Sequence, residues 1–367
     1  MVETQLQFDN EEIAMSFDVN STAAADSGLF GLPFGPDESR LHLIPVPWEV
    51  TTSYGDGASR GPAAILRASH QVDLFDIETG DVYRNGYFMH DIPVEIESLN
   101  KTMKAKARLV VEAIEDGRER DPQILKLQAE INAASERVNE WVYTNAKRIL
   151  AQSKIPAVIG GDHSTPFGLI RAVGEVYEGD FGILHVDAHA DLRNAYQGYS
   201  HSHASIMHNV VERIRPKKLV QVGIRDFSPG EYEYIKNSGG KVETYFDPIM
   251  KRRLNKGESW QSICDEVVAK LPNNVYISFD IDGLTPDLCP NTGTPVPGGL
   301  SVDQALTLFA TVAESGRKIV GFDLNEVAEP NDPLSDWDGN VGARLLFKLC
   351  GWAMITNGFG EMMKVEA

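Results

Sequence analysis

Several features that would place a protein in a specialised class are scarce in this sequence of 367 residues. Its cysteines form no CxxC pair, so we expect neither a disulfide framework nor a thiolate zinc site. No apolar run approaches the roughly 20 residues that span a bilayer. The opening residues, MVETQLQFDNEEIAM, lack the basic-then-apolar order of a secretion signal, so a cytoplasmic protein without a membrane partner is expected.

Positive charge is also in short supply. The formal net charge is −19, and clustered Lys and Arg are what phosphate binding requires, so nucleic acid is not an expected partner. The acidic balance favours the approach of a cationic substrate slightly, although solubility alone accounts for it. A hydrophobic content of 42% and a charged content of 24% are those of an ordinary globular protein.

The pattern of apolar runs predicts the fold. Residues 1–40 are polar with weak periodicity and are interpreted as an N-terminal extension, and 41–367 as one catalytic domain. Short apolar runs alternate with helix-length segments, which favours an α/β fold with a mostly parallel sheet covered on both faces. The expected strands are 41–46, 155–160, 181–187, 218–224, 275–281 and 318–324. The expected helices include 166–177, 203–214 and 301–315.

Residues 95–154 interrupt this alternation. The stretch is rich in Ala, Glu, Lys and Leu and nearly free of Gly and Pro. We expect a helical insertion of two helices, the second over 125–150 with Leu, Ile, Val and Trp on one face.

Three of the apolar runs end in residues of the kinds that bind metals. They are followed by GGDHS (160–164), DAHAD (187–191) and DIDG (280–283). Functional groups of an open parallel sheet gather at the carboxyl ends of its strands, and alternate side chains of an extended chain point the same way. We therefore expect one cluster. Its members are His163, Asp187, His189, Asp191, Asp280 and Asp282.

Four carboxylates and two imidazoles carry too much charge to cluster without a cation. The donors suit two divalent ions of intermediate hardness such as Mn²⁺, with Ni²⁺, Co²⁺ or Fe²⁺ as alternatives. Two such ions lie about 3.5–4 Å apart in hydrolytic sites and lower the pKa of a bridging water. The sequence thus predicts a dinuclear metal hydrolase.

Together with SFDIDGLTPDLCPNTGTPVPGGLS (278–301), these motifs resemble those of the ureohydrolases, the family of arginases and agmatinases. GDGASRGPAAILRAS (55–69) is similar to a segment near the start of agmatinase-like members. The resemblance implies a three-layer αβα fold, two Mn²⁺ or Ni²⁺ ions on the six residues, and a homo-oligomer, a trimer or hexamer. It also implies attack of a metal-bridging hydroxide on a guanidinium carbon with release of urea. Accessory proteins that load the metal are a further expectation.

The same resemblance assigns roles to individual residues. His203 matches the family's proton-shuttling histidine, but Ala204 replaces a glycine and His201 is two residues away, so either histidine could be the shuttle. Glu326 matches the carboxylate that binds the substrate guanidinium, a pairing that suits two parallel hydrogen bonds. Asp191 is counted with His203 and Glu326 among the catalytic residues. His185 lies inside a strand, where a supporting or core role is expected.

The substrate is the least determined point. Arg193, near the mouth of the expected site, would repel the distal ammonium of agmatine, unless it turns away into a salt bridge. Trp337 stands where agmatinases commonly have a Tyr-Asp pair, and it either shortens the pocket or simply packs. We therefore rank free guanidine slightly ahead of agmatine, with guanidinobutyrate third. The extension and the helical insertion could also cover the entrance.

Two other classes of protein remain as alternatives. Metal-dependent deacetylases have the same fold, but they use one zinc ion and fewer ligands. A non-catalytic scaffold descended from the family would be expected to have lost a ligand or Glu326, and neither is lost.

Overall fold

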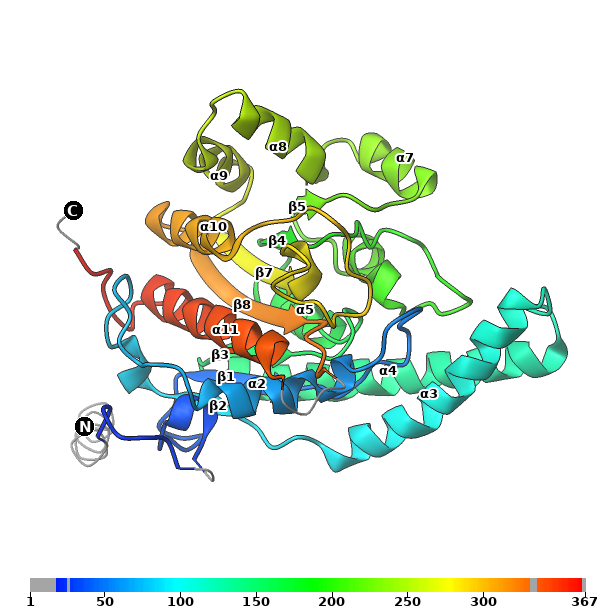
Figure 1. Cartoon of the computed structure of the whole chain (residues 1–367), viewed down its shortest axis with the longest axis horizontal. Coiled ribbons are helices and arrows are strands. Elements are labelled where there is room, and N and C mark those ends of the chain that lie inside the picture. The colour runs from blue at the N-terminus through cyan, green and yellow to red at the C-terminus, as the bar shows by residue number, and fades with distance from the viewer. Residues whose placement is uncertain (1–17, 25–26, 331–334, 365–367) are drawn as a thin grey trace.

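The computed structural model describes residues 18–24, 27–330 and 335–364. They are built around one sheet of eight strands in the order β2-β1-β3-β8-β7-β4-β5-β6, and every pair of neighbours is parallel (Figure 1). The expected parallel sheet is confirmed. None of the helices in these ranges is both long and apolar enough to cross a membrane.

The six strands expected from apolar runs are present within one or two residues of their predicted limits. They are β1 (Leu41–Pro45), β3 (Ile155–Ile159), β4 (Gly182–Val186), β5 (Lys218–Ile224), β7 (Asn274–Asp280) and β8 (Lys318–Asn325). Two strands were not predicted, β2 (Tyr87–Met89) and β6 (Val242–Phe246), and they form the two edges of the sheet.

Helices cover both faces, which confirms the three-layer αβα architecture. On one face of the sheet, the apolar sides of α2, α9, α10 and α11 pack against the strands. On the other face, the apolar sides of α3, α4, α5 and α6 do so (Figure 1). The first layer is formed by α2 (Gly61–Ser69), α8 (Asp247–Asn255), α9 (Trp260–Ala269), α10 (Val302–Glu314) and α11 (Trp337–Thr356). The second is formed by α3 (Val94–Glu115), α4 (Pro122–Ala151), α5 (Phe167–Val176), α6 (Ile206–Asn209) and α7 (Pro229–Asn237).

The insertion consists of two helices, α3 and α4, as its composition indicates. The buried residues of α4 include Ile131, Val138 and Val142, which lie on the apolar side that the sequence pattern predicts. The segment expected as one helix over 203–214 is divided instead. A 3-10 turn, η4 (His203–Ser205), precedes α6, and a π-helical turn, η5 (Val210–Ile214), follows it.

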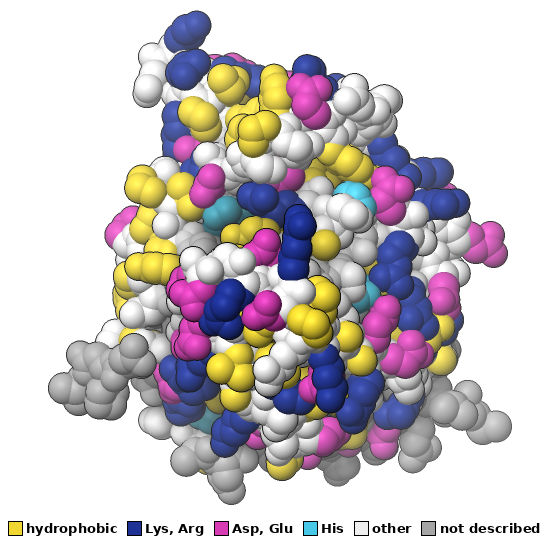
Figure 2. Space-filling view, turned by 90° about the vertical axis from the view of Figure 1, so that its right-hand side faces the viewer, with side chains coloured by type: hydrophobic (Ala, Val, Ile, Leu, Met, Phe, Trp, Pro, Cys, Tyr) yellow, Lys and Arg dark blue, Asp and Glu magenta, His cyan; other side chains and the backbone are white. Residues whose placement is uncertain are grey.

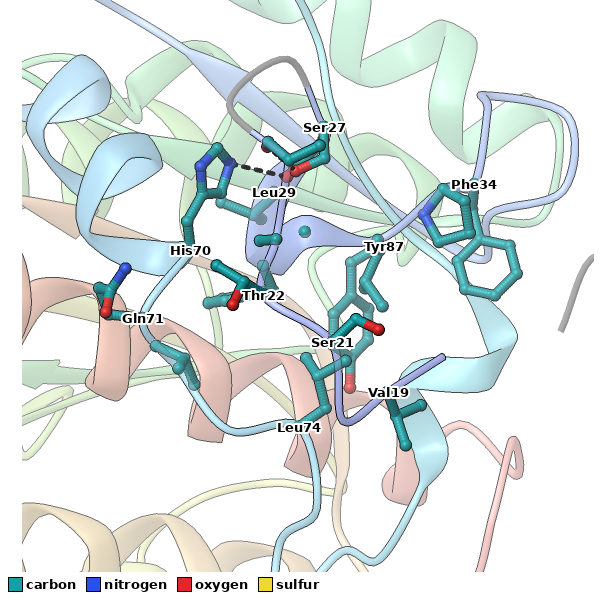
Figure 3. A pocket seen from close by; sticks show the side chains of 18 of the residues that line it. Val19, Ser21, Thr22, Ser27, Leu29, Phe34, His70, Gln71, Leu74 and Tyr87 are labelled. Atoms are coloured by element: carbon teal, nitrogen blue, oxygen red, sulfur yellow. Dashed lines mark hydrogen bonds between the residues drawn. The ribbon is translucent and has the colours of Figure 1, made fainter. Parts of the chain in front are cut away.

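The described part of the N-terminal segment lies beside β2 and the end of α2. Leu29, Phe30 and Leu32 are buried there. A cavity of about 1020 Å³ is lined by this segment, by the residues that follow α2, and by strand β2 itself (Figure 3). His70, which follows α2, contacts the carbonyl oxygen of Gly28 at 3.2 Å. The described residues of this segment therefore line a cavity at the sheet's β2 edge, away from the carboxyl ends of the central strands.

Candidate metal centre

The first group of predicted ligands follows β3 on a tightly packed loop. A Cβ atom at Gly161 would lie 1.9 Å from the carbonyl oxygen of Trp48, and one at Gly160 would lie 2.0 Å from Oδ1 of Asn325. Only glycine permits the backbone to approach these neighbouring atoms so closely. The loop therefore turns at once and places His163, which is fully buried, over the end of the sheet.

The second group follows β4, but strand alternation is not what brings its side chains together. β4 ends at Val186, before the first of these residues. Asp191 has a φ of 55°, a left-handed conformation that a residue with a side chain adopts only when its surroundings impose it. Its carbonyl oxygen accepts hydrogen bonds from the backbone N–H groups of Met207 and His208, both at 3.1 Å. The start of α6 thus holds the turn that directs the Asp191 carboxylate inward.

The third group straddles the end of β7. Asp280 is the last residue of β7, and Asp282 lies in the following 3-10 turn, η6 (Ile281–Gly283). Oδ1 of Asp280 accepts the backbone N–H of Asp282 at 2.9 Å, which fixes the turn. Because of that turn, the two carboxylates face different histidines.

The six residues, buried except for the partly exposed His189, form one group, which we call the acidic cluster. In one half, Nδ1 of His163 lies 2.9 Å from Oδ2 of Asp187, 3.1 Å from Oδ2 of Asp280 and 3.4 Å from Oδ2 of Asp191. In the other half, Nδ1 of His189 lies 3.1 Å from Oδ2 of Asp282 and 3.5 Å from Oδ1 of Asp187. Asp187 is the member that contacts both histidines, one with each oxygen.

The pKa values show how strongly the cluster attracts positive charge. Burial lowers the pKa of His163, but its hydrogen bonds to the carboxylates of Asp187 and Asp280 outweigh burial and raise that pKa well above its usual range. Burial also opposes protonation of His189, yet the carboxylates beside it raise its pKa to about 12. Burial, followed by the charge of Asp187, raises the pKa of Asp191 well above normal. Without another cation, the cluster retains protons.

The donor set fits divalent ions. Carboxylate oxygens and imidazole nitrogens suit ions of intermediate hardness, and the described residues place no thiolate among these donors. Among the described residues, two groups offer ligand atoms within 4.8 Å of one another: His163, His185, Asp187 and Asp191 in one, and Asp187, His189 and Asp282 in the other. Two neighbouring groups that share one carboxylate can hold two ions.

Glu326 lies directly after β8, also at positive φ, 60°. Its backbone N–H donates to the carbonyl oxygen of Gly161 at 2.8 Å, and its Oε1 accepts the backbone N–H of His163 at 3.0 Å. Oε2 is buried and has no hydrogen-bond partner among the described residues. Burial and the charge of Asp280 raise the pKa of this carboxyl well above normal. An unpaired buried carboxylate oxygen is costly, so it marks a place for a cationic group.

His203 lies near the cluster and is held by Thr51 and Asp162. The Thr51 hydroxyl donates to Oδ2 of Asp162 at 2.8 Å, accepts the backbone N–H of His203 at 3.0 Å, and lies 3.4 Å from Nδ1 of its ring. Burial lowers the pKa of His203, and the charge of Asp162 opposes this shift. The ring is thus neutral around pH 7 and able to exchange a proton. Neither Thr51 nor Asp162 was singled out from the sequence, although Asp162 lies within GGDHS.

His201 points elsewhere. Its Nδ1 lies 3.1 Å from Nδ2 of Asn139, and its Nε2 lies 3.1 Å from Glu136 and 2.9 Å from Arg213. These contacts hold the ring against α4. Of the two histidines left open by the sequence, the structure brings only His203 toward the acidic cluster.

Arg193 and Trp337 also have partners outside the cluster. Nε of Arg193 lies 3.6 Å from Oε2 of the buried Glu231, while its side chain stays partly exposed. The indole N–H of Trp337 donates to the carbonyl oxygen of Asp287 at 3.0 Å. Trp337 therefore fastens the loop after β7 to the start of α11, and the charge of Arg193 is partly compensated.

The side of the molecule onto which these strands open has no surface of one sign. Figure 2 views that side, and its Lys and Arg side chains are interspersed with Asp and Glu, with histidines visible between them.

Comparison with known proteins places the chain in a family. Residues 39–351 match the model of the arginase family. An N(1)-aminopropylagmatine ureohydrolase of Thermus thermophilus is 32% identical over 295 residues, which cover 80% of this chain and 84% of that protein. A guanidinobutyrase of Pseudomonas aeruginosa is 27% identical over 317 residues, 84% of each chain. The crystal structure of a hypothetical agmatinase from Burkholderia thailandensis has the same fold, with a TM-score of 0.68 at 22% identity, covering 92% of this chain and 94% of that one. The chain belongs to the arginase family.

Proposed function

We propose that this protein is a dinuclear-metal amidinohydrolase that cleaves the C–N bond of a small guanidino compound and releases urea. The observation that carries the proposal is the free Oε2 of Glu326, a buried carboxylate oxygen beside the acidic cluster. A metal site alone would fit many hydrolases. A metal site next to an unpaired carboxylate fits a substrate with a planar cation.

The six residues of the acidic cluster would hold two divalent ions, Mn²⁺ or Ni²⁺. When bound, such ions lower the pKa of water and supply a nucleophile near neutral pH. Asp187 contacts both halves of the cluster, so its carboxylate would keep the ions close together, and Asp191 would serve the half that contains His163. The ions would replace the protons that the cluster otherwise retains.

Glu326 would bind and orient the substrate. Its Oε1 is held by the backbone of the His163 loop, so Oε2 has a fixed position relative to the cluster. A guanidinium N–H that donates to Oε2 places the guanidinium carbon near the ions. The positive φ of Glu326 is consistent with this role, because such strain persists where the surroundings impose a functional geometry.

His203 would give a proton to the departing nitrogen. Burial lowers its pKa below the usual value, so the ring is held neutral, and Thr51 and Asp162 orient it. The leaving group then departs as a neutral amine or as ammonia, and urea remains. His201, which is held against α4, would take no part in this transfer.

We rank free guanidine first as substrate, hydrolysed with one water to urea and ammonia. The backbone N–H of Gly55 donates to the carbonyl oxygen of Gly293 at 3.1 Å, and a Cβ at Gly293 would lie 3.4 Å from Oε2 of Glu326. Two loops therefore meet beside the free oxygen, which favours a compact substrate. Agmatine is the second candidate, since the Thermus thermophilus relative is named for aminopropylagmatine. The ion pair of Arg193 with Glu231 weakens its repulsion of an ammonium tail.

A substrate panel tests this order. Metal-free protein is loaded separately with Mn²⁺ and with Ni²⁺, and urea and ammonia are measured with guanidine, agmatine, arginine and guanidinobutyrate. We expect the highest kcat/KM for guanidine with one of the two metals. The highest kcat/KM for agmatine would overturn the ranking but keep the reaction class. No urea from any guanidino compound with either metal would contradict the proposal itself.

A further inference from the structure

A row of polar side chains crosses the otherwise apolar sheet beneath the acidic cluster. In the strand register, Ser278 pairs with Asp323 and with His185, His185 pairs with Gln221, and Gln221 pairs with Thr244. The row thus takes one residue from each of β8, β7, β4, β5 and β6. All except Thr244 are fully buried. We call these five residues the polar row.

The arm through β5 ends on Asp187. The Thr244 hydroxyl lies 2.9 Å from Oε1 of Gln221, and Nε2 of Gln221 lies 2.7 Å from the carbonyl oxygen of Ala190. A carbonyl only accepts, so this second contact fixes Nε2 as a donor. Nε2 of Gln221 also lies 3.0 Å from Nδ1 of His185. Because Nε2 is the donor, Nδ1 is the acceptor and carries no proton. The remaining proton of neutral His185 is on Nε2, 2.9 Å from Oδ2 of Asp187.

The arm through β7 ends on His163. The Ser278 hydroxyl lies 2.9 Å from Oδ1 of Asp323, an oxygen that also accepts the backbone N–H of Phe279 at 3.3 Å. Ser278 therefore donates to Asp323 and can only accept from Nε2 of His163, 2.9 Å away. When the proton of His163 is on Nε2, its Nδ1 is unprotonated and can bind an ion.

We propose that the polar row fixes which nitrogen of His163 and of His185 carries the proton, and thereby orients two ligands of the acidic cluster toward the ions. Gln221, His185, Ser278 and Asp323 are then positioning residues. This inference rests on the proposed metal site. It assigns His185 to orienting Asp187 through a hydrogen bond, rather than to binding an ion itself.

Packing alone does not account for the row. Apolar side chains of similar size would fill a sheet interior without the cost of burying polar groups. The residues on either side of the four buried members of the row, Asp323, Ser278, His185 and Gln221, are apolar. Every contact described above runs toward a ligand of the acidic cluster or fixes a member that does. Groups that hold metal ligands in this way typically change metal affinity by 10- to 100-fold when they are removed.

The test uses Gln221→Met and Ser278→Ala in the full chain. Gln221→Met keeps the length of the side chain but removes the donor to His185, and Ser278→Ala removes the acceptor for His163. Ser135→Ala is the matched control, because Ser135 is also a buried serine with a single hydrogen bond, to the carbonyl oxygen of Ile131 in α4. Mn²⁺ affinity is measured by calorimetry and folding by circular dichroism. The protonated nitrogen of His185 is identified from histidine ¹⁵N shifts, in ion-free and in Zn²⁺-loaded protein.

We expect Mn²⁺ to bind about 10- to 100-fold more weakly to both row variants and unchanged to Ser135→Ala. In the wild type, His185 should keep its proton on Nε2 with and without Zn²⁺, whereas Gln221→Met should lose this preference. Wild-type affinity in both row variants, or loss of the Nε2 proton of His185 on adding Zn²⁺, would overturn the inference. A wild type that binds no ions would instead contradict the proposed function.

Discussion

The centre of the sheet and its β2 edge each hold a pair of histidines, one buried and one partly buried, yet the two pairs are held in opposite ways. In the acidic cluster, His163 and His189 lie among carboxylates, and their pKa values are raised. At the edge, Nδ1 of His42 lies 3.1 Å from Nε2 of His90, and Nζ of Lys154 lies 3.3 Å from Nε2 of His42. Burial and the charge of Lys154 lower the pKa of His42 to about 4.

The difference lies in the neighbours rather than in the histidines. At the edge, the second nitrogen of His42 contacts the carbonyl oxygen of Pro36 at 2.9 Å, so the neutral pair is complete without an ion. In the cluster, the carboxylates outnumber the histidines, and only added positive charge can balance them. Burial of histidine therefore does not identify a metal site, whereas the number of carboxylates around it does.

The largest effect should come from removing the carboxylate that contacts both histidines of the cluster. Asp187→Asn keeps the shape but removes the charge, and we expect loss of at least one bound ion. Because a metal ion supplies several kcal/mol of stabilisation, urea production should fall on the order of 10³-fold. Elemental analysis and steady-state assays measure both.

Asp76→Asn serves as its control. Asp76 is also buried, but it pairs with Lys348 far from the cluster, so it should cost stability and leave the ion count unchanged. An Asp187→Asn protein with two ions and normal activity would remove the proposed distinction between centre and edge.

The two histidines that the sequence left open provide the next test. His203→Gln should lower kcat about 10²-fold, the lower end of what a proton donor contributes, with little change in bound metal. His201→Gln should change kcat only a few-fold, because its ring contacts Asn139 and Glu136. Steady-state kinetics over a pH range compares them. A larger loss of kcat in His201→Gln than in His203→Gln would reverse the assignment.

The fold was predictable where burial is complete. Central strands such as β4 and β7 are buried on both faces and read as continuous apolar runs. The edge strands were missed for the same reason. β6 reads VETYF, with only Val242 and Tyr245 buried, and β2 has only three residues, so neither forms an apolar run. A search for continuous runs finds the middle of a sheet and not its margins.

The acidic cluster was predictable because its members follow strand ends, which topology brings together. Its detailed geometry was not, since Asp191 and Glu326 reach the cluster through positive φ values that no residue pattern indicates. The partners of Arg193 and Trp337 lie 38 and 50 residues away in sequence, on other loops. The polar row left one visible sign, polar residues such as Gln221 and Ser278 within apolar strands, and its meaning appears only in the strand register.

A change at Glu326 tests whether substrate binding and metal binding are separate within the centre of the sheet. Glu326→Gln should retain both ions but lose the charge that pairs with a guanidinium, lowering kcat/KM by about 10- to 100-fold. Steady-state assays and elemental analysis measure the two effects. The control is Glu329→Gln, which changes a partly exposed carboxylate paired with Arg60. A variant that loses its ions together with its activity would instead make Glu326 part of the metal site.

The smallest effect tests the edge pair by pH. Since the pKa of His42 is about 4 in the folded chain and about 6.5 when unfolded, only the unfolded chain takes up this proton between those values. The free energy of unfolding should therefore fall as pH drops from about 6.5 to about 4, and be unaffected by His42 above that window. The lowered pKa of His90 acts in the same direction. Because His90, the partner of His42, is only half-buried and solvent screens part of the shift, we expect a loss on the order of 1 kcal/mol. Urea unfolding of wild type and His42→Asn at several pH values measures it, and equal slopes in both proteins would show that the edge pair is not held neutral.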